Sequence, residues 1–186
     1  MSEKMIVFIN GPTAVGKTTV SRILKEQHGA TMVSISTILR EEGKKVGAKT
    51  AADFVEKNLK GSIEKKLACI INNLKPIVAK NNLICIESAY NQIEIDAIKK
   101  YFGKKGSVEF KAVYLTADLN KRINRLMRRE NIKDRRCALI RTLLVNAIRS
   151  KMGMTNIKYD IVHKNNSKKA PKKLVKKIIK PTRRRL

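Results

Sequence analysis

The sequence predicts one α/β domain in which a central parallel β-sheet carries helices on both faces. Two observations lead to this prediction. Short, nearly all-apolar segments alternate along the chain with longer segments whose apolar residues recur every three or four positions, which is the pattern of buried parallel strands joined by amphipathic helices. The length of 186 residues also suits one domain with a full hydrophobic core.

Buried strands are expected where apolar residues follow one another without alternation. The segments MIVFIN, at residues 5–10, and NLICIES, at residues 82–88, are the clearest examples. Because helical segments separate the strands, we expect the strands to be parallel. The complete set of expected strands is 5–10, 31–35, 82–88, 109–116 and 159–163.

Helices are expected where apolar residues recur at helical spacing. Val20, Ile23 and Leu24 mark one face of a first helix at residues 17–27, and Gly29 is a typical stop for it. The further expected helices are 36–45, 50–60, 62–80 with an interruption at Pro76, 92–102, 119–130 and 138–152.

The charge of the chain is far from balanced. It has 42 lysines and arginines against 15 aspartates and glutamates, and its formal net charge is +27. Such an excess attracts polyanions, which include nucleotides, nucleic acids, acidic proteins and anionic lipids. The alternative is a lysine-rich composition that leaves a basic surface without a partner.

The cysteines and the apolar segments indicate a reducing compartment. Cys69, Cys85 and Cys137 lie far apart, and the sequence has no CxxC pair and only two histidines, so it indicates no zinc site. Unpaired thiols in apolar segments are typical of a reducing environment. We find no signal peptide and no apolar segment long enough to span a bilayer, and we therefore expect a cytoplasmic protein without a membrane partner.

The segment GPTAVGKT carries the strongest functional signal. It matches the pattern GxxxxGK[ST] between an apolar strand and an amphipathic helix, which is the context of a phosphate-binding loop (P-loop) in a three-layer P-loop NTPase fold. Its glycines let backbone amides wrap around a polyphosphate, while Lys17 reaches the β- and γ-phosphates and Thr18 binds Mg²⁺. The residues expected to hold the nucleotide are Gly11, Pro12, Thr13, Ala14, Val15, Gly16, Lys17, Thr18 and Thr19.

Other charged residues suit phosphoryl transfer, which needs mainly positioning and charge neutralisation. Glu87 ends an apolar run that would place its carboxylate beside the loop, where it could orient Mg²⁺. Arg122, Arg125 and Arg129 recur at helical spacing, so they share one helix face that could close over the transferring phosphates. The alternatives are an exposed acid at a strand end and a solvated basic face.

From residue 5 to about residue 179 the chain resembles the nucleoside monophosphate kinases, and looks closest to the adenylate-kinase-like and dephospho-coenzyme-A-kinase-like group. Four segments carry the resemblance: GPTAVGKT, SISTILREEGKKVG, NLICIES with the following AYNQIEIDAIKKYF, and LTADLNKRINRLMRRENIKDRR. The chain departs from the family pattern at residues 36–37, which read Ser-Thr for Gly-Asp, and at residues 87–88, which read Glu-Ser for Asp-Gly. It also lacks the usual arginine at residues 89–91.

The resemblance implies a P-loop kinase domain at residues 1–180. Within this domain it implies acceptor-binding helices at about 36–80, a small lid at about 125–137, and a final helix at 171–180 that packs on the sheet. The apolar residues Leu174, Val175, Ile178 and Ile179 have helical spacing there and would face the core.

The resemblance also implies roles for single residues. Arg40 stands at the arginine that holds the acceptor phosphate in the family. Asn165 follows the last expected strand, where the family places its adenine-contacting loop. Tyr90 is expected to line the acceptor pocket, with a plain loop position as the alternative.

Residues 181–186, PTRRRL, are expected to form a basic C-terminal tail. Blocks of this kind often contact nucleic acid or direct nuclear import, so a nuclear location is the alternative to a cytoplasmic one. Aromatic residues make up only 4% of the chain, which argues against base stacking. Any nucleic-acid contact would therefore be non-specific and made to phosphate.

Taken together, these features predict Mg²⁺-dependent transfer of the γ-phosphate of ATP to a nucleotide-like small molecule. The alternative is an NTP-binding and NTP-hydrolysing protein that acts with nucleic acid. The basic excess and the altered acceptor segments at residues 36–37 and 89–91 favour that alternative.

Overall fold

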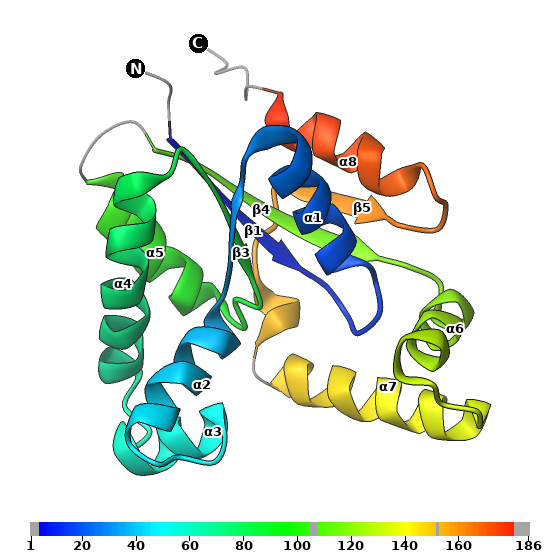
Figure 1. Ribbon diagram of the computed structural model, residues 1–186, viewed down its shortest axis with the longest axis horizontal. Helices are drawn as coiled ribbons and strands as arrows, with labels where there is room; N and C mark the ends of the chain where they lie inside the picture. The colour runs from blue at the N-terminus through cyan, green and yellow to red at the C-terminus, as the bar shows by residue number, and fades with distance from the viewer. Residues whose placement is uncertain (1–3, 105–107, 152, 181–186) are drawn as a thin grey trace.

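The computed structural model describes residues 4–104, 108–151 and 153–180. At its centre lies a five-stranded sheet of order β2-β3-β1-β4-β5, in which every neighbouring pair of strands is parallel (Figure 1). The strands are β1 (Lys4–Asn10), β2 (Thr31–Ser34), β3 (Leu83–Glu87), β4 (Val108–Thr116) and β5 (Ile161–Lys164). The predicted α/β fold class and the parallel sheet are confirmed.

Helices cover both faces of this sheet. They are α1 (Lys17–His28), α2 (Ile35–Lys45), α3 (Ala51–Asp53), α4 (Ile63–Lys80), α5 (Gln92–Gly103), α6 (Leu119–Glu130), α7 (Arg135–Lys151) and α8 (Ala170–Ile179), with a π-helical turn at Phe54–Asn58 and a 3₁₀ turn at Met154–Asn156. Helices α1 and α8 pack on one face, and α4 and α5 pack on the other. Helix α7 runs back from α6 past the carboxyl ends of the strands towards α2 and α3 (Figure 1).

The apolar run in β1 reflects a strand that is buried on both faces. Ile6 and Phe8 pack into the core layer that contains α4 and α5, whereas Val7 and Ile9 pack into the layer that contains α1 and α8. All four side chains are fully buried. This central strand therefore delivers the loop at residues 11–16 to the carboxyl edge of the sheet, which is where ligands bind in open α/β folds.

The predicted interruption at Pro76 is wrong, because α4 runs unbroken through the proline from Ile63 to Lys80. The buried side chains Ile70, Leu74 and Val78 lie on one stripe of α4 against the core. Packing on both sides of the proline holds the helix together despite the missing backbone donor.

The segment predicted as one helix at residues 50–60 is instead α3 followed by the π-helical turn. Thr50 caps α3, since its hydroxyl accepts a hydrogen bond from the backbone N–H of Asp53 at 3.0 Å. Phe54 is buried against Gly43, where a Cβ would lie only 2.9 Å from the Cβ of Phe54. Packing of Phe54, which sequence periodicity does not reveal, accompanies the change of helix type.

Helices α7 and α8 differ little from prediction. Helix α7 begins at Arg135 rather than at residue 138, because Asp134 Oδ1 accepts a hydrogen bond from the N–H of Arg136 at 2.8 Å. Helix α8 confirms the final helix on the sheet, with Leu174, Val175 and Ile178 buried.

The predicted basic tail at residues 181–186 lies outside the described residues. In the part of the chain that the structure describes, we find no helix that combines the length and the apolarity needed to cross a membrane.

Candidate active site

The P-loop has a backbone that only small residues allow. It connects β1 to the N-terminus of α1, and both of its glycines have positive φ angles, +139° at Gly11 and +101° at Gly16. A Cβ at Gly16 would collide with the side-chain amide of Asn165, and one at Gly11 would collide with the carbonyl of Leu115. The loop is thus packed tightly against the strand and loop behind it, with its open side towards solvent.

Lys17 lies folded over the loop. Its Nζ donates hydrogen bonds to the carbonyl oxygens of Gly11 at 2.9 Å and Pro12 at 3.1 Å. Burial, followed by the positive charge of Arg149, lowers the pKa of Lys17 to about 7, while the carboxylate of Glu87 opposes this shift. A bound polyphosphate would supply the negative charge that this buried ammonium lacks.

A cavity of about 560 Å³ opens beside the loop, and we call it the donor cavity. Its walls combine the loop with charged residues from three other elements. The residues that line it are Thr13, Ala14, Val15, Gly16, Lys17, Thr18, Thr19, Glu87, Ser88, Arg125, Arg129 and Arg149. Pro12 carries one of the carbonyls that accept from Lys17. The structure therefore brings the predicted loop residues together with Glu87 and with two of the three predicted arginines.

The Glu87 carboxylate stands at the end of β3 and lines the donor cavity together with Thr18. Its Oε1 is buried and has no hydrogen-bond partner among the described residues. Thr18 is exposed to solvent at the first turn of α1. A carboxylate and a hydroxyl are oxygen ligands that Mg²⁺ accepts, and Mg²⁺ beside a nucleotide needs only one or two protein ligands. These two residues fit the ion.

The predicted arginines of α6 separate into different environments. Arg125 is tied to the loop, because it donates to the carbonyls of Val15 at 3.1 Å and Asn165 at 2.8 Å. Arg129 lines the donor cavity with an exposed side chain that pairs with Glu130 at 2.7 Å. Arg122 instead lines a smaller cavity, which Pro12 also lines.

Asn165 lies directly behind the loop. Its side-chain amide donates to the Val15 carbonyl at 2.7 Å, and its Oδ1 is buried without a partner among the described residues. The side chain is 2% exposed. Asn165 therefore supports the loop from behind and is not among the described residues that line the donor cavity. Its expected place in an adenine-contacting loop stays a prediction.

A second cavity of about 530 Å³, which we call the acceptor cavity, adjoins the donor cavity at Arg149. Its lining is mainly apolar. The apolar side chains are Leu39, Ala51, Ala52, Val55, Val145 and Ile148, and the polar ones are Ser36, Glu56, Lys66, Tyr90 and Arg149. Tyr90 is among the residues that line this cavity, and its expected role towards an acceptor stays a prediction. The Lys66 ammonium is already paired with Glu94 Oε1 at 2.6 Å.

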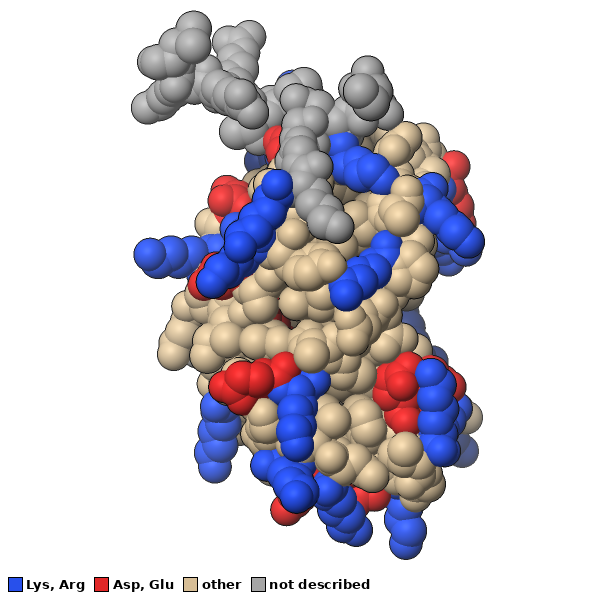
Figure 2. Space-filling model, turned by 90° about the vertical axis from the view of Figure 1, so that its left-hand side faces the viewer, with Lys and Arg blue, Asp and Glu red and all other residues tan. Residues whose placement is uncertain are grey.

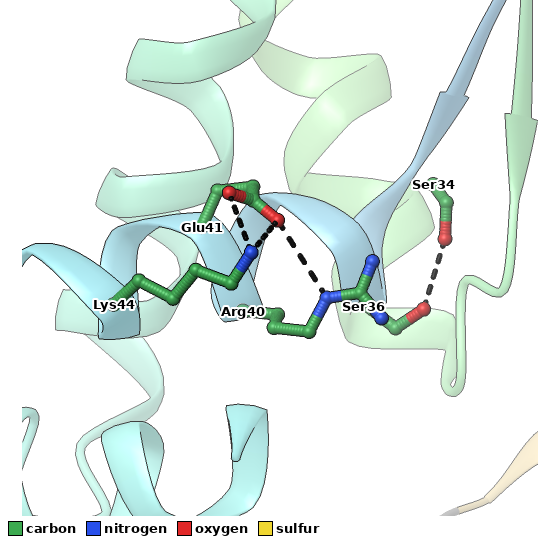
Figure 3. A network of polar contacts seen from close by, with 5 residues as sticks. All are labelled: Ser34, Ser36, Arg40, Glu41 and Lys44. Atoms are coloured by element: carbon green, nitrogen blue, oxygen red, sulfur yellow. Dashed lines mark hydrogen bonds and ion pairs between the residues drawn. The ribbon is translucent and has the colours of Figure 1, made fainter. Parts of the chain in front are cut away.

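Arg40 is not among the described residues that line either cavity. Figure 3 shows its side chain on α2 beside Glu41, with 3.7 Å between Arg40 Nε and Glu41 Oε1. Nearby, the hydroxyls of Ser34 and Ser36 lie 2.9 Å apart (Figure 3). The side chain of Arg40 is 56% exposed. Tyr90 lines the acceptor cavity and Arg40 does not, so the structure does not bring the two together in one cavity.

Sequence reasoning missed Arg149 and Asn146, both on α7. Arg149 lines both cavities and donates a long hydrogen bond of 3.4 Å to the Gly11 carbonyl. Asn146 Oδ1 accepts from the backbone N–H of Thr13 at 3.3 Å. The available signal was their spacing of three, which puts both polar residues on one side of a helix that also carries exposed apolar residues.

The sequence of this chain is similar to that of known proteins. A family model described as "AAA domain" matches residues 7–146. A cytidylate kinase from Oleidesulfovibrio alaskensis is 38% identical over 68 residues, which are 37% of this chain and 29% of that enzyme. The chain thus matches less than a third of the length of this curated relative.

Solved structures with a similar fold cover almost the whole chain. They include an uncharacterized protein from Eubacterium ventriosum (TM-score 0.63, 15% identity, 96% of this chain and 100% of that one) and TT1252 from Thermus thermophilus (TM-score 0.59, 16%, 96% and 100%). A shikimate kinase from Bacteroides thetaiotaomicron has a TM-score of 0.55 at 13% identity, with 94% and 95% covered. The chain belongs to the AAA domain family, and its fold is that of the P-loop nucleotide kinases that its sequence resembles.

Proposed function

We propose that this protein transfers the γ-phosphate of ATP to a nucleotide-like small molecule, with Mg²⁺ as the metal. One observation carries the proposal: a P-loop cavity and a second cavity of similar size meet at a shared arginine, Arg149. A phosphotransferase needs two binding sites whose ligands meet at the transferring phosphoryl group, and an NTP hydrolase needs only the first.

On the donor side, the residues Gly11 to Thr19 hold the triphosphate with backbone amides and the α1 N-terminus. Lys17 supplies the charge beside the β- and γ-phosphates. Arg129 and Arg149 face the same cavity and stabilise the charge that develops during transfer. Arg125 and Asn165 keep the loop in shape through the Val15 carbonyl.

Thr18 and Glu87 are the residues that would hold Mg²⁺. The unpartnered, buried Oε1 of Glu87 supports this assignment. Held by these two residues, Mg²⁺ would supply positive charge that offsets the charge of the phosphates. Within the described residues no cluster of three or more His, Cys, Asp and Glu side chains could hold a metal ion, so the phosphates themselves would supply the other ligands.

On the acceptor side, the apolar walls formed by α2, α3 and α7 suit a flat or aliphatic body, and Tyr90 offers a ring beside it. Arg149, at the junction, is placed to meet the acceptor's reacting group. Arg40 could reach an acceptor phosphate only by leaving Glu41. We therefore assign the main acceptor cation to Arg149 and a secondary role to Arg40.

We further propose that the region around residues 125–137, with α7 behind it, closes as a lid. Ile148 lines the acceptor cavity and yet is 58% exposed, and the neighbouring Leu144 is 59% exposed. Closure over a bound acceptor would cover this apolar surface and remove water, which competes as a phosphate acceptor.

The nucleic-acid alternative rests on the net charge and on the altered segments at residues 36–37 and 89–91. Figure 2 shows the face of the molecule that carries α4 and α5, and there the basic side chains stand among acidic ones. Several are paired, as Lys44 is with Glu41 at 3.0 Å. We propose small-molecule phosphotransfer as the activity.

We also propose a reducing compartment such as the cytoplasm, because Cys69, Cys85 and Cys137 are all unpaired.

The test is an ATP-consumption assay with a panel of acceptors, chiefly nucleoside monophosphates and small hydroxy acids, run beside the same assay with RNA or DNA. We expect one class of small molecule to stimulate ADP release and to carry the γ-phosphate afterwards. Stimulation by nucleic acid alone would support the alternative.

A further inference from the structure

A third cavity of about 190 Å³ is lined in part by Pro12, and it shares Arg149 with the donor cavity. Its polar lining comes from β4, α6 and α7, at Tyr114, Arg122, Asn146, Arg149 and Ser150. The volume is about a third of that of the donor cavity, so it suits a small ion or acid rather than a nucleotide. The proposed reaction does not use this space.

Arg122 is the unusual residue of this cavity. Its Nε and Nη1 are both buried and have no hydrogen-bond partner among the described residues. A guanidinium stays charged under all ordinary conditions, so it cannot escape this burial by losing its proton. Burial lowers the pKa of Arg122 below its usual range, because desolvation disfavours the charged guanidinium.

The other polar groups of the cavity add hydrogen-bond donors. Arg149 brings a second guanidinium, and its hydrogen bond to the Gly11 carbonyl is long, at 3.4 Å. Asn146 uses its side-chain oxygen to accept from Thr13 N–H, which leaves its amide N–H groups for the cavity. The hydroxyls of Tyr114 and Ser150 can donate as well.

The lining therefore has a single electrostatic character. Among the described residues that line the cavity, none is a carboxylate, and two are arginines. Guanidinium groups bind carboxylate and phosphate oxygens in bidentate geometry, and such charge-assisted hydrogen bonds are the strong ones. A small oxyanion would satisfy the buried nitrogens of Arg122 and offset positive charge of the two guanidinium groups.

We propose that this cavity is a second anion site, separate from the P-loop, which binds inorganic phosphate or a small carboxylate between Arg122 and Arg149. Because Arg149 also lines the donor and acceptor cavities, an anion here would share that residue with the reacting groups. We therefore expect an anion in this cavity to change the affinity of the protein for nucleotide.

The experiment is a calorimetric titration of the full-length protein with inorganic phosphate. A saturating non-hydrolysable ATP analogue and Mg²⁺ are present throughout, so that the P-loop is already filled. We expect saturable binding to one site in the wild type. Arg122→Gln should weaken this binding about 10- to 100-fold. Arg128→Gln is the matched control, because Arg128 is exposed on the same helix and lines none of the three cavities described above.

A parallel titration with acetate and malonate distinguishes the two oxyanion classes, and tighter binding of either class supports the site. Thermal unfolding gives an independent measurement without nucleotide. Phosphate should raise the melting temperature of Lys17→Ala but not of Lys17→Ala/Arg122→Gln, and Arg122→Gln alone should not be less stable than the wild type. Equal phosphate affinity of wild type and Arg122→Gln, or no saturable binding of any of the three anions, would overturn the proposal.

Discussion

The donor and acceptor cavities have nearly equal volumes, about 560 and 530 Å³, but they are built in different ways. The donor cavity is mostly one continuous segment, residues 13–19, whose backbone conformation and lysine create the binding surface. The acceptor cavity collects single side chains from α2, α3, α4 and α7 and has mainly apolar walls. Among the described residues that line them, only Arg149 is shared by the two cavities.

This difference separates two kinds of specificity. Polyphosphate recognition by backbone amides depends on loop conformation, so it varies little with the side chains around it. The acceptor cavity depends on the shape left between helices that pack against one another, so a change of one side chain alters what fits. We therefore expect substitutions in the two cavities to have separable effects on ATP and on the acceptor.

The largest effect is expected from Lys17→Ala. The variant loses the charge beside the β- and γ-phosphates, so turnover should fall by at least about 10²–10³-fold, the usual cost of removing one group that stabilises transition-state charge. ATP binding should weaken at the same time, as measured by calorimetry. Lys25→Ala, at an exposed position of the same helix, is the control and should behave as wild type. Near-normal turnover of Lys17→Ala would remove the P-loop from the reaction.

Arg149→Gln should affect both substrates, because Arg149 is the shared residue. We expect kcat/KM to fall about 10- to 100-fold for ATP and for the acceptor alike, since one charge-assisted hydrogen bond is lost in the transition state. Arg40→Gln provides the contrast and should raise only the acceptor KM, by a smaller factor. A larger acceptor effect of Arg40→Gln than of Arg149→Gln would show that α2, rather than α7, supplies the main acceptor cation.

Ala52→Phe should affect the acceptor alone. Ala52 lines the acceptor cavity and is exposed. The phenyl ring introduced there should therefore fill part of the cavity without disturbing the core. The acceptor KM should rise about tenfold or more, by the loss of one well-fitted contact surface, while the Kd for ATP stays the same. Ala147→Phe is matched to it, because Ala147 is exposed on α7 and is not among the described residues of either cavity. Equal KM values in the two variants would place the acceptor elsewhere.

A further effect is a pH dependence confined to the donor side. The pKa of Lys17 is about 7 in the ligand-free protein, so above pH 7 ATP binding must take up a proton, and affinity should fall by about tenfold for each further pH unit. Below pH 7 the lysine is already charged and affinity should level off. Calorimetry at pH 6 and pH 8, in buffers of different ionisation enthalpy, measures this proton uptake. Equal uptake at both values would contradict the assignment to Lys17.

The same shift has an opposite sign for folding. Because the pKa of Lys17 lies below its ordinary value of 10.5, the charged lysine destabilises the ligand-free fold at and below pH 7. This destabilisation is relieved as the pH rises from about 7 towards 10.5. Chemical denaturation of wild type and Lys17→Met across this range would detect it as a difference that disappears at high pH.

The donor cavity could be predicted from the sequence to a greater extent than the acceptor cavity. The strands and the P-loop are local patterns, so MIVFIN and GPTAVGKT were sufficient to place β1, the loop and Lys17. Glu87 could also be placed, because an apolar run that ends in an acid puts the acid at the carboxyl edge of the sheet. Each of these inferences needs only neighbours in the chain.

The acceptor cavity could not be predicted in this way. Its walls depend on where α7 lies relative to α2 and α3, and the role of Arg149 appears only when α7 returns past the end of β1. The spacing of Arg122, Arg125 and Arg129 placed all three on one face of a helix, yet Arg122 lines a different cavity from the other two. Helical spacing predicts which side chains share a face, but it does not predict which parts of the protein that face contacts. Pro76 shows that packing can also override a local signal.

The most direct test of the account follows the γ-phosphate itself. The protein is incubated with γ-labelled ATP and Mg²⁺, with and without the small-molecule panel, and the label is traced to product. We predict that the label moves to a small-molecule acceptor, and that at low acceptor concentration this transfer is slower in Ala52→Phe than in Ala147→Phe. Label released only as inorganic phosphate, at a rate that RNA or DNA increases and the panel does not, would contradict the account.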